Sequence, residues 1–322
     1  MKTKIVAGII LVVIIAVTYT SFNGKGDIQK NSTIKIGAVL PLTGDAGTYG
    51  MDSKNSIQLA VNEINANGGI DDQNIEVIFE DGKCSGKDAT SAAQKLITID
   101  KVNVIIGGLC SGEALAIAPI AEKANILHFS SGASSPELTG VSKVFFRNAP
   151  SDSGAGKKIA ELANTNNHKN IAVISENSDY SQALREVFTK SHTGNGGTIV
   201  YDETFNPDTK DFRSFITKIK NANPDAIFIN PQTDIGASVL VKQIKEAGVT
   251  AQIYANVFPG TKVFLDKSST YAEGVLFTDA PGLDVTNKKS TDFESNYKKT
   301  YGNVPSYLFY AGGAYDTVYI IK

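Results

Sequence analysis

The 322-residue sequence has only two cysteines and three histidines, which leaves little material for metal-binding or nucleophilic chemistry. His128 falls in a predicted strand, His168 in a polar loop and His192 at a predicted helix end. Neither the HExxH spacing of zinc enzymes nor a GxSxG nucleophile elbow occurs. Ser111 and His128 could form a dyad on paper, but no orienting acid accompanies them, so a buried strand histidine is favoured. The sequence predicts no enzyme and no cofactor or metal site.

An excess of positive charge is also missing. The chain carries 31 basic and 33 acidic side chains. Loss of the first 20 residues would remove Lys2 and Lys4 and leave 29 basic and 33 acidic groups, a formal charge of −4. This balance argues against a nucleic-acid partner, and clusters such as Lys288 and Lys289 are interpreted as solvated surface.

The N-terminus has the pattern of an export signal, because Lys2 and Lys4 precede an apolar run from Ile5 to Val17. The run is shorter than the roughly 20 residues that span a bilayer, and no good cleavage site follows it. Residues 1–30 are therefore either a signal peptide or a membrane anchor, and the protein is expected outside the cytoplasm. No cysteine follows the run before Cys84, so lipid attachment has no acceptor.

The rest of the chain contains no low-complexity tract and is long enough for two domains, since domain sizes cluster near roughly 100–150 residues. Short β-branched runs alternate with helical periods from Thr33 onward, which predicts an α/β fold of two Rossmann-like lobes with parallel sheets. The first series has predicted strands at 34–40, 75–80, 104–106 and 126–130, and helices near 57–64, 88–99 and 113–124. The second has helices near 153–163, 182–190, 212–219 and 235–247, and strands at 171–174, 198–204, 226–229, 252–254 and 274–277.

Two Gly/Ser-rich turns follow strands of the first series, where ligands of parallel sheets bind. One turn, 107–112, opens a helix at Glu113, and its free N–H groups suit an anion such as a carboxylate or phosphate. A phosphate-binding P-loop is excluded because Glu113 stands where a lysine is required. The other turn, 130–137, contains Ser134, which also fits a capping box with Glu137. A plain turn is the alternative for each, but at least one of Ser111, Ala133 and Ser134 is expected to contact a ligand.

Cys84 and Cys110 are the only thiols, and sequence alone leaves open a single disulfide or two buried free thiols. An extracytoplasmic location favours the disulfide.

The motifs taken together resemble the leucine/isoleucine/valine-binding proteins, which are type I periplasmic binding proteins. The similarity runs in order and spacing from about Thr33 to the end of the chain. The motifs that carry it are Pro41-Leu42-Thr43-Gly44, Ile64-Asn65-Ala66-Asn67-Gly68-Gly69-Ile70, Asp81-Gly82-Lys83-Cys84, Gly108-Leu109-Cys110-Ser111, Gly132-Ala133-Ser134-Ser135-Pro136-Glu137-Leu138, Phe146-Arg147-Asn148, Asp211-Phe212 and Ala272-Glu273-Gly274.

The resemblance implies two lobes joined by a hinge, with 31–148 plus 277–322 as the first lobe and 149–276 as the second. It implies the monomeric solute receptor of an ABC importer, with a permease as partner and an amino acid or related small carboxylate or amide as ligand. A sensory ectodomain held by the leader is the alternative. A hydrolase on a related scaffold is a third hypothesis, which lacks a nucleophile and base.

The resemblance also assigns roles to residues. Cys84–Cys110 would be the family disulfide, and Ser111, Ala133 and Ser134 would clasp the ligand carboxylate from the first lobe. Tyr49 would line the side-chain pocket, Tyr180 would close over the ligand, and Gln232 falls near another expected pocket aromatic. For Tyr49 and Tyr180, an amphipathic surface position is the alternative.

Two positions depart from the family pattern. Val257 stands where the amino-acid binders have an acid that pairs with the ligand ammonium, and an unpaired buried charge costs roughly 3–5 kcal/mol. Either another acid, such as Asp234 or Asp279, moves in, or the ligand is an acid or amide without that ammonium. The chain also stops within a predicted helix, 311–322, so the C-terminus is expected to be truncated relative to the family.

Overall fold

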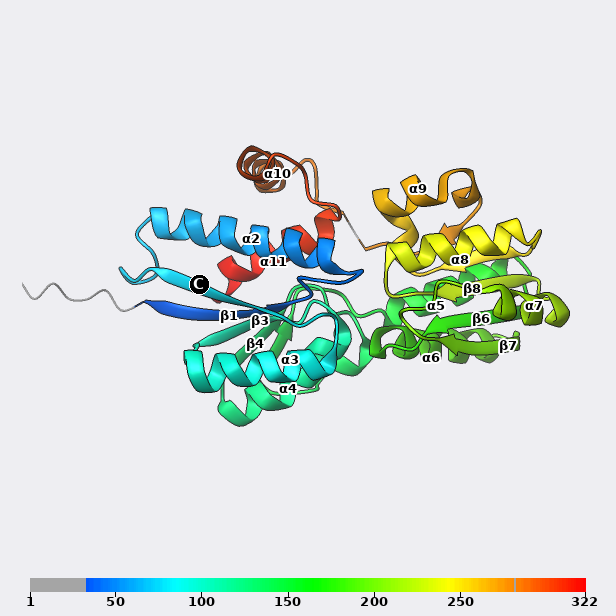
Figure 1. Ribbon diagram of the computed structural model, residues 1–322, viewed down its shortest axis with the longest axis horizontal. Helices are drawn as coiled ribbons and strands as arrows, with labels where there is room; N and C mark the ends of the chain where they lie inside the picture. The colour runs from blue at the N-terminus through cyan, green and yellow to red at the C-terminus, as the bar shows by residue number, and fades with distance from the viewer. Residues whose placement is uncertain (1–32, 281) are drawn as a thin grey trace, which may run out of the picture.

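The computed structural model describes residues 33–280 and 282–322, which form two α/β lobes lying side by side (Figure 1). Each lobe contains a five-stranded parallel sheet, so the predicted fold class is confirmed. The predicted leader, 1–30, lies outside the described residues. Within the described part of the chain, no helix has both the length and the apolar character needed to cross a bilayer.

The first sheet has the strand order β2-β1-β3-β4-β5. Its inner strand β1 is buried along Ile36–Leu40 because helices cover both faces of the sheet. Helices α2 and α11 lie on one face and α3 and α4 on the other (Figure 1). The strands are β1 (Ile34–Leu40), β2 (Ile75–Asp81), β3 (Val104–Gly107), β4 (Leu127–Ser130) and β5 (Phe145–Arg147). The helices are α2 (Gly47–Ala66), α3 (Gly86–Lys95), α4 (Ser111–Ala124), α10 (Lys288–Tyr301) and α11 (Leu308–Ile321), with a π-helical turn at Leu96–Asp100 and a 3-10 turn at Pro136–Leu138.

The second sheet has the order β10-β9-β8-β6-β7. Every residue of its central strand β8 is buried. The strands are β6 (Asn170–Glu176), β7 (Thr198–Phe205), β8 (Ala226–Asn230), β9 (Gln252–Ala255) and β10 (Leu276–Phe277). The helices are α5 (Ser153–Thr165), α6 (Asp179–Gly194), α7 (Arg213–Ala222), α8 (Asp234–Glu246) and α9 (Lys262–Ser268), with 3-10 turns at Phe258–Gly260 and Ser269–Ala272.

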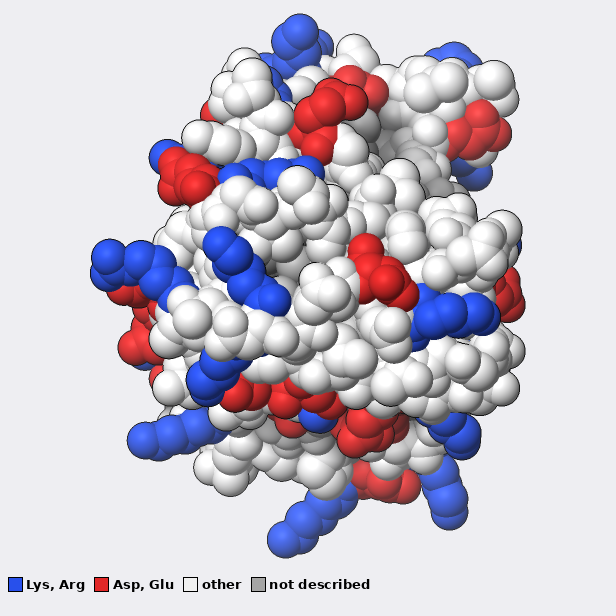
Figure 2. Space-filling view, turned by 90° about the vertical axis from the view of Figure 1, so that its right-hand side faces the viewer, with Lys and Arg blue, Asp and Glu red and all other residues white. Residues whose placement is uncertain are grey.

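On the face of the molecule shown in Figure 2, basic and acidic side chains are interspersed.

The chain passes between the lobes after β5 and again after β10, and its last helices pack against α2 of the first lobe. The lobe boundaries drawn at 148/149 and 276/277 stay predictions.

Several elements differ from the sequence-based prediction. Helix α2 begins at Gly47, ten residues before the apolar stripe. Its first turn carries Tyr49, whose ring packs against Phe258 of the opposite lobe and against Tyr310 of its own lobe. Strand β5 and helices α9 and α10 were not predicted. Helix α10 buries only Phe293 and Tyr297, so its sequence lacks the wide apolar stripe that marks a core helix.

Candidate functional site

The carboxyl ends of the two sheets face each other (Figure 1), so the loops that follow the strands meet between the lobes. The loops after β1, β3 and β4 reach the junction from the first lobe, and those after β6, β8 and β9 reach it from the second.

These loops enclose a small cavity of about 30 Å³, which is space for about one water. The cavity brings together five of the six residues predicted to contact a ligand. Tyr49, Ser111 and Ser134 face it from the first lobe, and Tyr180 and Gln232 from the second. Its remaining lining consists of Ala46, Leu109, Cys110, Gly132, Phe258 and Tyr310.

Ala133, the sixth predicted residue, does not line the cavity. Its side chain is buried against Ala114 and Leu138. Its N–H donates to the Ser130 hydroxyl at 3.1 Å, and its carbonyl accepts from Arg147 at 3.3 Å. The backbone polar groups of Ala133 are therefore used within the first lobe.

The two serine turns lie against each other. Ser111 is the first residue of α4, and its hydroxyl accepts from the Ser135 N–H at 3.2 Å. Ser134 donates from its hydroxyl to the Asp152 carboxylate at 2.8 Å. The capping box with Glu137 was the alternative considered for Ser134, but the structure has Ser135 as the cap of the short 3-10 turn, with its hydroxyl accepting from the Glu137 N–H at 3.3 Å. Ser134 is the residue left facing the cleft.

Cys84 and Cys110 form a disulfide with a Cα–Cα distance of 5.3 Å, which confirms the predicted pairing. The bond ties the loop after β2 to the N-terminus of α4. The buried Glu113 carboxylate accepts from the Cys84 N–H at 2.9 Å and from the Cys110 N–H at 3.1 Å. A Cβ at Gly82 would lie 2.2 Å from the Glu113 Oε1, and one at Gly108 would lie 2.1 Å from the Glu113 Cβ, so both glycines make room for this side chain.

Burial raises the pKa of Glu113 to about 7, although the cysteine N–H groups act in the opposite direction. From the sequence, Glu113 was interpreted only as the residue that opens a helix and that excludes a phosphate-binding loop. Its bracing of both cysteine loops was not predicted, because the contact to Cys84 joins residues far apart in the sequence.

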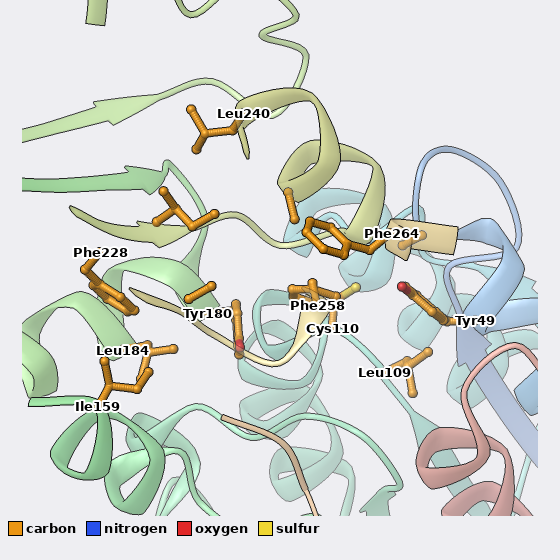
Figure 3. Close-up of a cluster of buried hydrophobic side chains, with 14 of the residues drawn as sticks. Tyr49, Leu109, Cys110, Ile159, Tyr180, Leu184, Phe228, Leu240, Phe258 and Phe264 are labelled. Atoms are coloured by element: carbon orange, nitrogen blue, oxygen red, sulfur yellow. The ribbon is translucent and has the colours of Figure 1, made fainter. Parts of the chain in front are cut away.

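An aromatic cluster closes the cavity, with Phe258 between Tyr49 and Tyr180 (Figure 3). The ring centroids of Tyr49 and Phe258 are 6.2 Å apart, and those of Tyr180 and Phe258 are 6.0 Å apart. Phe258 directly follows Val257 in the loop after β9, and the sequence did not single it out. The buried Asn256 orients this loop, since its side chain accepts from the Phe258 N–H at 3.3 Å and donates to Asn230 at 2.9 Å.

Gln232 contacts the opposite lobe directly. Its side-chain amide donates to the Cys84 sulfur at 3.2 Å, while its backbone N–H donates to Glu176 at 2.9 Å. A neighbouring cavity of about 580 Å³ continues the cleft on this side and shares Ala46 and Gln232 with the small cavity.

A third cavity, of about 490 Å³, lies on the other side and shares Gly132, Ser134, Tyr180 and Tyr310 with the small one. Val257 lines it, together with Asp152 and Asp279. Burial raises the pKa of Asp152 to about 6. Asp234, one of the two acids considered from the sequence, does not line these cavities. It is buried at the start of α8, where its carboxylate accepts from the Thr261 hydroxyl at 3.1 Å.

Comparisons with known proteins agree with this architecture. A family model described as "Periplasmic binding protein" matches residues 33–322. The Leu/Ile/Val-binding protein homolog 3 of Brucella melitensis is 28% identical over 293 residues, which is 90% of this chain and 77% of the relative.

Two solved structures also match, each with a TM-score of 0.78. One is the branched-chain amino acid transporter substrate binding protein of Streptococcus pneumoniae in complex with isoleucine. It is 31% identical to this chain, and the match covers 90% of this chain and 83% of that protein. The other is a solute binding protein of an ABC transporter from Rhodopseudomonas palustris in complex with 3,4-dihydroxybenzoic acid. It is 26% identical to this chain, and the match covers 90% of this chain and 79% of that protein.

Proposed function

Because the chain belongs to the periplasmic binding protein family, in its branched-chain amino-acid branch, we propose that it captures an amino acid or a related small carboxylate or amide for an ABC importer. Members of this family are extracytoplasmic solute-binding proteins. The observation that carries the proposal is the convergence of Tyr49, Ser111, Ser134, Tyr180 and Gln232, from both lobes, on one cavity at the facing strand ends.

The serine turns supply the carboxylate site in this proposal. Ser111 and Gly112 are the first two residues of α4, so their N–H groups are helix N-terminal donors that have no acceptor within the helix. The dipole of α4 adds partial positive charge at the same place, which favours a carboxylate. The rings of Tyr49, Tyr180 and Phe258 offer apolar surface to the body of the solute.

Closure of the lobes would provide the signal to the permease. A cavity of about 30 Å³ cannot admit an amino acid, so the lobes have to part for entry. A solute docked on the serine turns gains the contacts with Tyr180 and Gln232 only when the lobes close, and that difference in affinity shifts the population toward the closed form. We propose the crossings near 148/149 and 276/277 as the hinge.

Calorimetry tests the proposal with leucine, isoleucine and 3,4-dihydroxybenzoate as probes. Replacing Ser111 and Ser134 together by alanine should weaken the best probe by at least about 30-fold, since each lost hydrogen bond to a charged group costs about 1.5 kcal/mol or more. The control is Ser214→Ala on the exposed side of α7. Unchanged affinity in the double variant would reject the serine site. Native mass spectrometry of the exported protein would identify a co-purified solute.

Two alternatives receive less support. Two of the matching solved structures are named as binding proteins of transporters, which does not favour a sensory ectodomain. The proposal includes no chemical step. Ser111 and His128, which could form a dyad on paper, have other hydrogen-bond partners. The Ser111 hydroxyl accepts from Ser135, while His128 Nε2 pairs with the Gly107 carbonyl and burial lowers the pKa of His128 to about 4.

We further propose a monomer without a nucleic-acid partner, whose leader is either removed or retained as a membrane tether. Light scattering of the purified protein would measure the oligomeric state, and intact-mass analysis would show whether the leader is present.

A further inference from the structure

The first turns of α4 and α6 meet across the cleft between the lobes. Gly112 is the second residue of α4 in the first lobe, and Asp179 is the first residue of α6 in the second lobe. Both residues line the cavity of about 580 Å³, and neither lines the small cavity of about 30 Å³. This contact therefore lies beside the proposed solute site and not within it.

Gly112 and Asp179 approach each other closely. A Cβ on Gly112 would lie 2.4 Å from the Oδ2 atom of Asp179, 3.4 Å from its Cγ and 3.8 Å from its Cβ. The two longer distances are ordinary contacts, so only the carboxylate end of Asp179 would overlap such a Cβ. The closed arrangement therefore has room for the Asp179 carboxylate because residue 112 has no side chain.

Charge also favours this contact. Helices α4 and α6 both direct their N-termini at the cleft, and a helix N-terminus carries partial positive charge from its unpaired N–H groups. Two such ends that face each other repel, and a carboxylate between them offsets the repulsion. Within residues 33–280 and 282–322, Asp179 forms no salt bridge, so its charge is not already paired with a basic side chain.

Two other acids lie near Asp179. Glu137 of the first lobe and Glu186 of the second lobe line a cavity of about 220 Å³ together with Asp179. All three side chains are exposed, so solvent screens their charges and the repulsion among them is weak. Solvent screens the attraction of Asp179 to the α4 terminus as well, so we expect the close fit to contribute more than the charge.

Sequence neighbours couple this contact to the solute site. Ser111 precedes Gly112, Tyr180 follows Asp179, and both of these neighbours line the small cavity. When the first turns of α4 and α6 meet, Ser111 and Tyr180 are therefore brought onto the same cavity from opposite lobes.

We infer that Gly112 and Asp179 form a latch that holds the two lobes closed from outside the solute cavity. This inference rests on the closure of the lobes in the proposed function. Because the latch lies outside the solute cavity, it should multiply the affinity for every solute by the same factor, through the population of the closed form. It thus sets how tightly solutes bind without selecting among them.

Cysteine cross-linking tests whether the latch forms, without the need for a solute. The Cβ–Cβ distance of 3.8 Å between positions 112 and 179 matches the mean of about 3.8 Å for disulfides. The variant Gly112→Cys/Asp179→Cys should therefore form a bond between the lobes on mild oxidation, while Cys84–Cys110 stays paired, as located by peptide mass mapping. Asp179→Cys/Gly194→Cys is the control, because its cysteines lie at opposite ends of α6 and should form no internal bond. Absence of the bond between positions 112 and 179 would overturn the inference.

Calorimetry measures the effect of the latch on binding, with leucine, isoleucine and 3,4-dihydroxybenzoate as probes and circular dichroism to verify folding. Asp179→Ala should weaken every probe that the wild type binds by about three- to tenfold, with factors that agree within about threefold. Asp266→Ala should leave affinity unchanged, because Asp266 is also exposed but pairs with Lys262 inside the second lobe. Unchanged affinity in Asp179→Ala, or factors that differ by more than about threefold between probes, would contradict a latch.

Gly112→Ala separates the latch from a direct effect on the solute. It should weaken binding in the wild type because the new Cβ displaces the Asp179 carboxylate, and should have little further effect in Asp179→Ala, where the overlapping atoms are absent. Gly194→Ala is the control, because its new Cβ would meet nothing within 4 Å. Additive losses from Gly112→Ala and Asp179→Ala would show that Gly112 acts on the solute and would overturn the latch. A wild type that binds none of the probes would reject the proposed function, and the cross-linking result would still decide whether the latch exists.

Discussion

Lys210 of the second lobe and Asp45 of the first form an ion pair across the cleft, with 2.9 Å between Nζ and Oδ2. The two side chains are 56% and 44% exposed, so solvent screens the pair, and its contribution is expected to be below about 1 kcal/mol. Because the pair exists only while the lobes are together, it adds to the free energy of closure and not to the stability of either lobe.

Lys210→Gln should therefore weaken solute binding by about two- to fivefold at low salt, and the difference from wild type should shrink as sodium chloride is raised. Calorimetry at two salt concentrations measures both effects. Lys218→Gln is the matched control, because Lys218 is also 56% exposed but pairs with Glu203 inside the second lobe. Equal effects of the two substitutions would contradict a role in closure.

Phe258→Ala should change which solutes bind. The substitution removes the ring that contacts both Tyr49 and Tyr180, so the closed cavity should gain volume and lose apolar contact. We expect isoleucine affinity to fall at least tenfold and the ratio of phenylalanine to isoleucine affinity to rise. Calorimetry with both amino acids measures this ratio, and Phe258→Leu, which retains most of the volume, should give an intermediate value. A ratio that is unchanged in both variants would show that Phe258 does not set the pocket size.

Glu113 should make stability depend on pH. Burial raises its folded-state pKa from 4.5 to about 7, so the folded protein binds this proton over a pH range in which the unfolded chain has released it. The free energy of unfolding from this group should fall as pH rises from about 4.5 to 7, by up to about 3 kcal/mol at about 1.36 kcal/mol per pKa unit.

Urea denaturation at pH 5 and pH 8 measures this effect. Glu113→Gln cannot ionise and should lack this part of the slope, so the difference in stability between wild type and variant should depend on pH. Parallel pH profiles for the two proteins would rule out the proposed titration.

Loss of the Cys84–Cys110 bond should lower the free energy of unfolding by about 3.5 kcal/mol, from the loop entropy of a separation of 26 residues. The variant with both cysteines replaced by serine tests this in denaturant titrations, with the reduced wild type as a second measurement. We also expect weaker solute binding, because the Gln232 side chain then loses its contact with the Cys84 sulfur. Intact affinity in the double variant would place the disulfide outside the binding step.

The features that could be predicted from the sequence were those that depend on patterns among residues close together in the chain. The β-branched run of β1 and the apolar stripe from Ile57 to Ile64 each report local burial, and the positions of Ser111 and Ser134 follow from turns that end strands. The site residues that sequence reasoning missed depend on contacts between distant segments.

Phe258 and Asp152 illustrate the limit. Phe258 meets Tyr49 of the opposite lobe, and Asp152 meets Ser134 across the crossing between the lobes. Neither position lies in a period or motif that marks it as part of the cleft. Ala133 shows the opposite error. It was predicted to contact the ligand because it lies in the same turn as Ser134, but its side chain is buried in the core.

The joint anchoring of Cys84 and Cys110 by a covalent bond and by Glu113 has a consequence for how binding preference can change. In the proposed site, the first lobe presents the same donors to any carboxylate, while Gln232 lies in the loop after β8 and Val257 and Phe258 lie in the loop after β9 of the second lobe. Single substitutions in those two loops can therefore change which solute is preferred without disturbing the first-lobe groups that bind the carboxylate common to all of them.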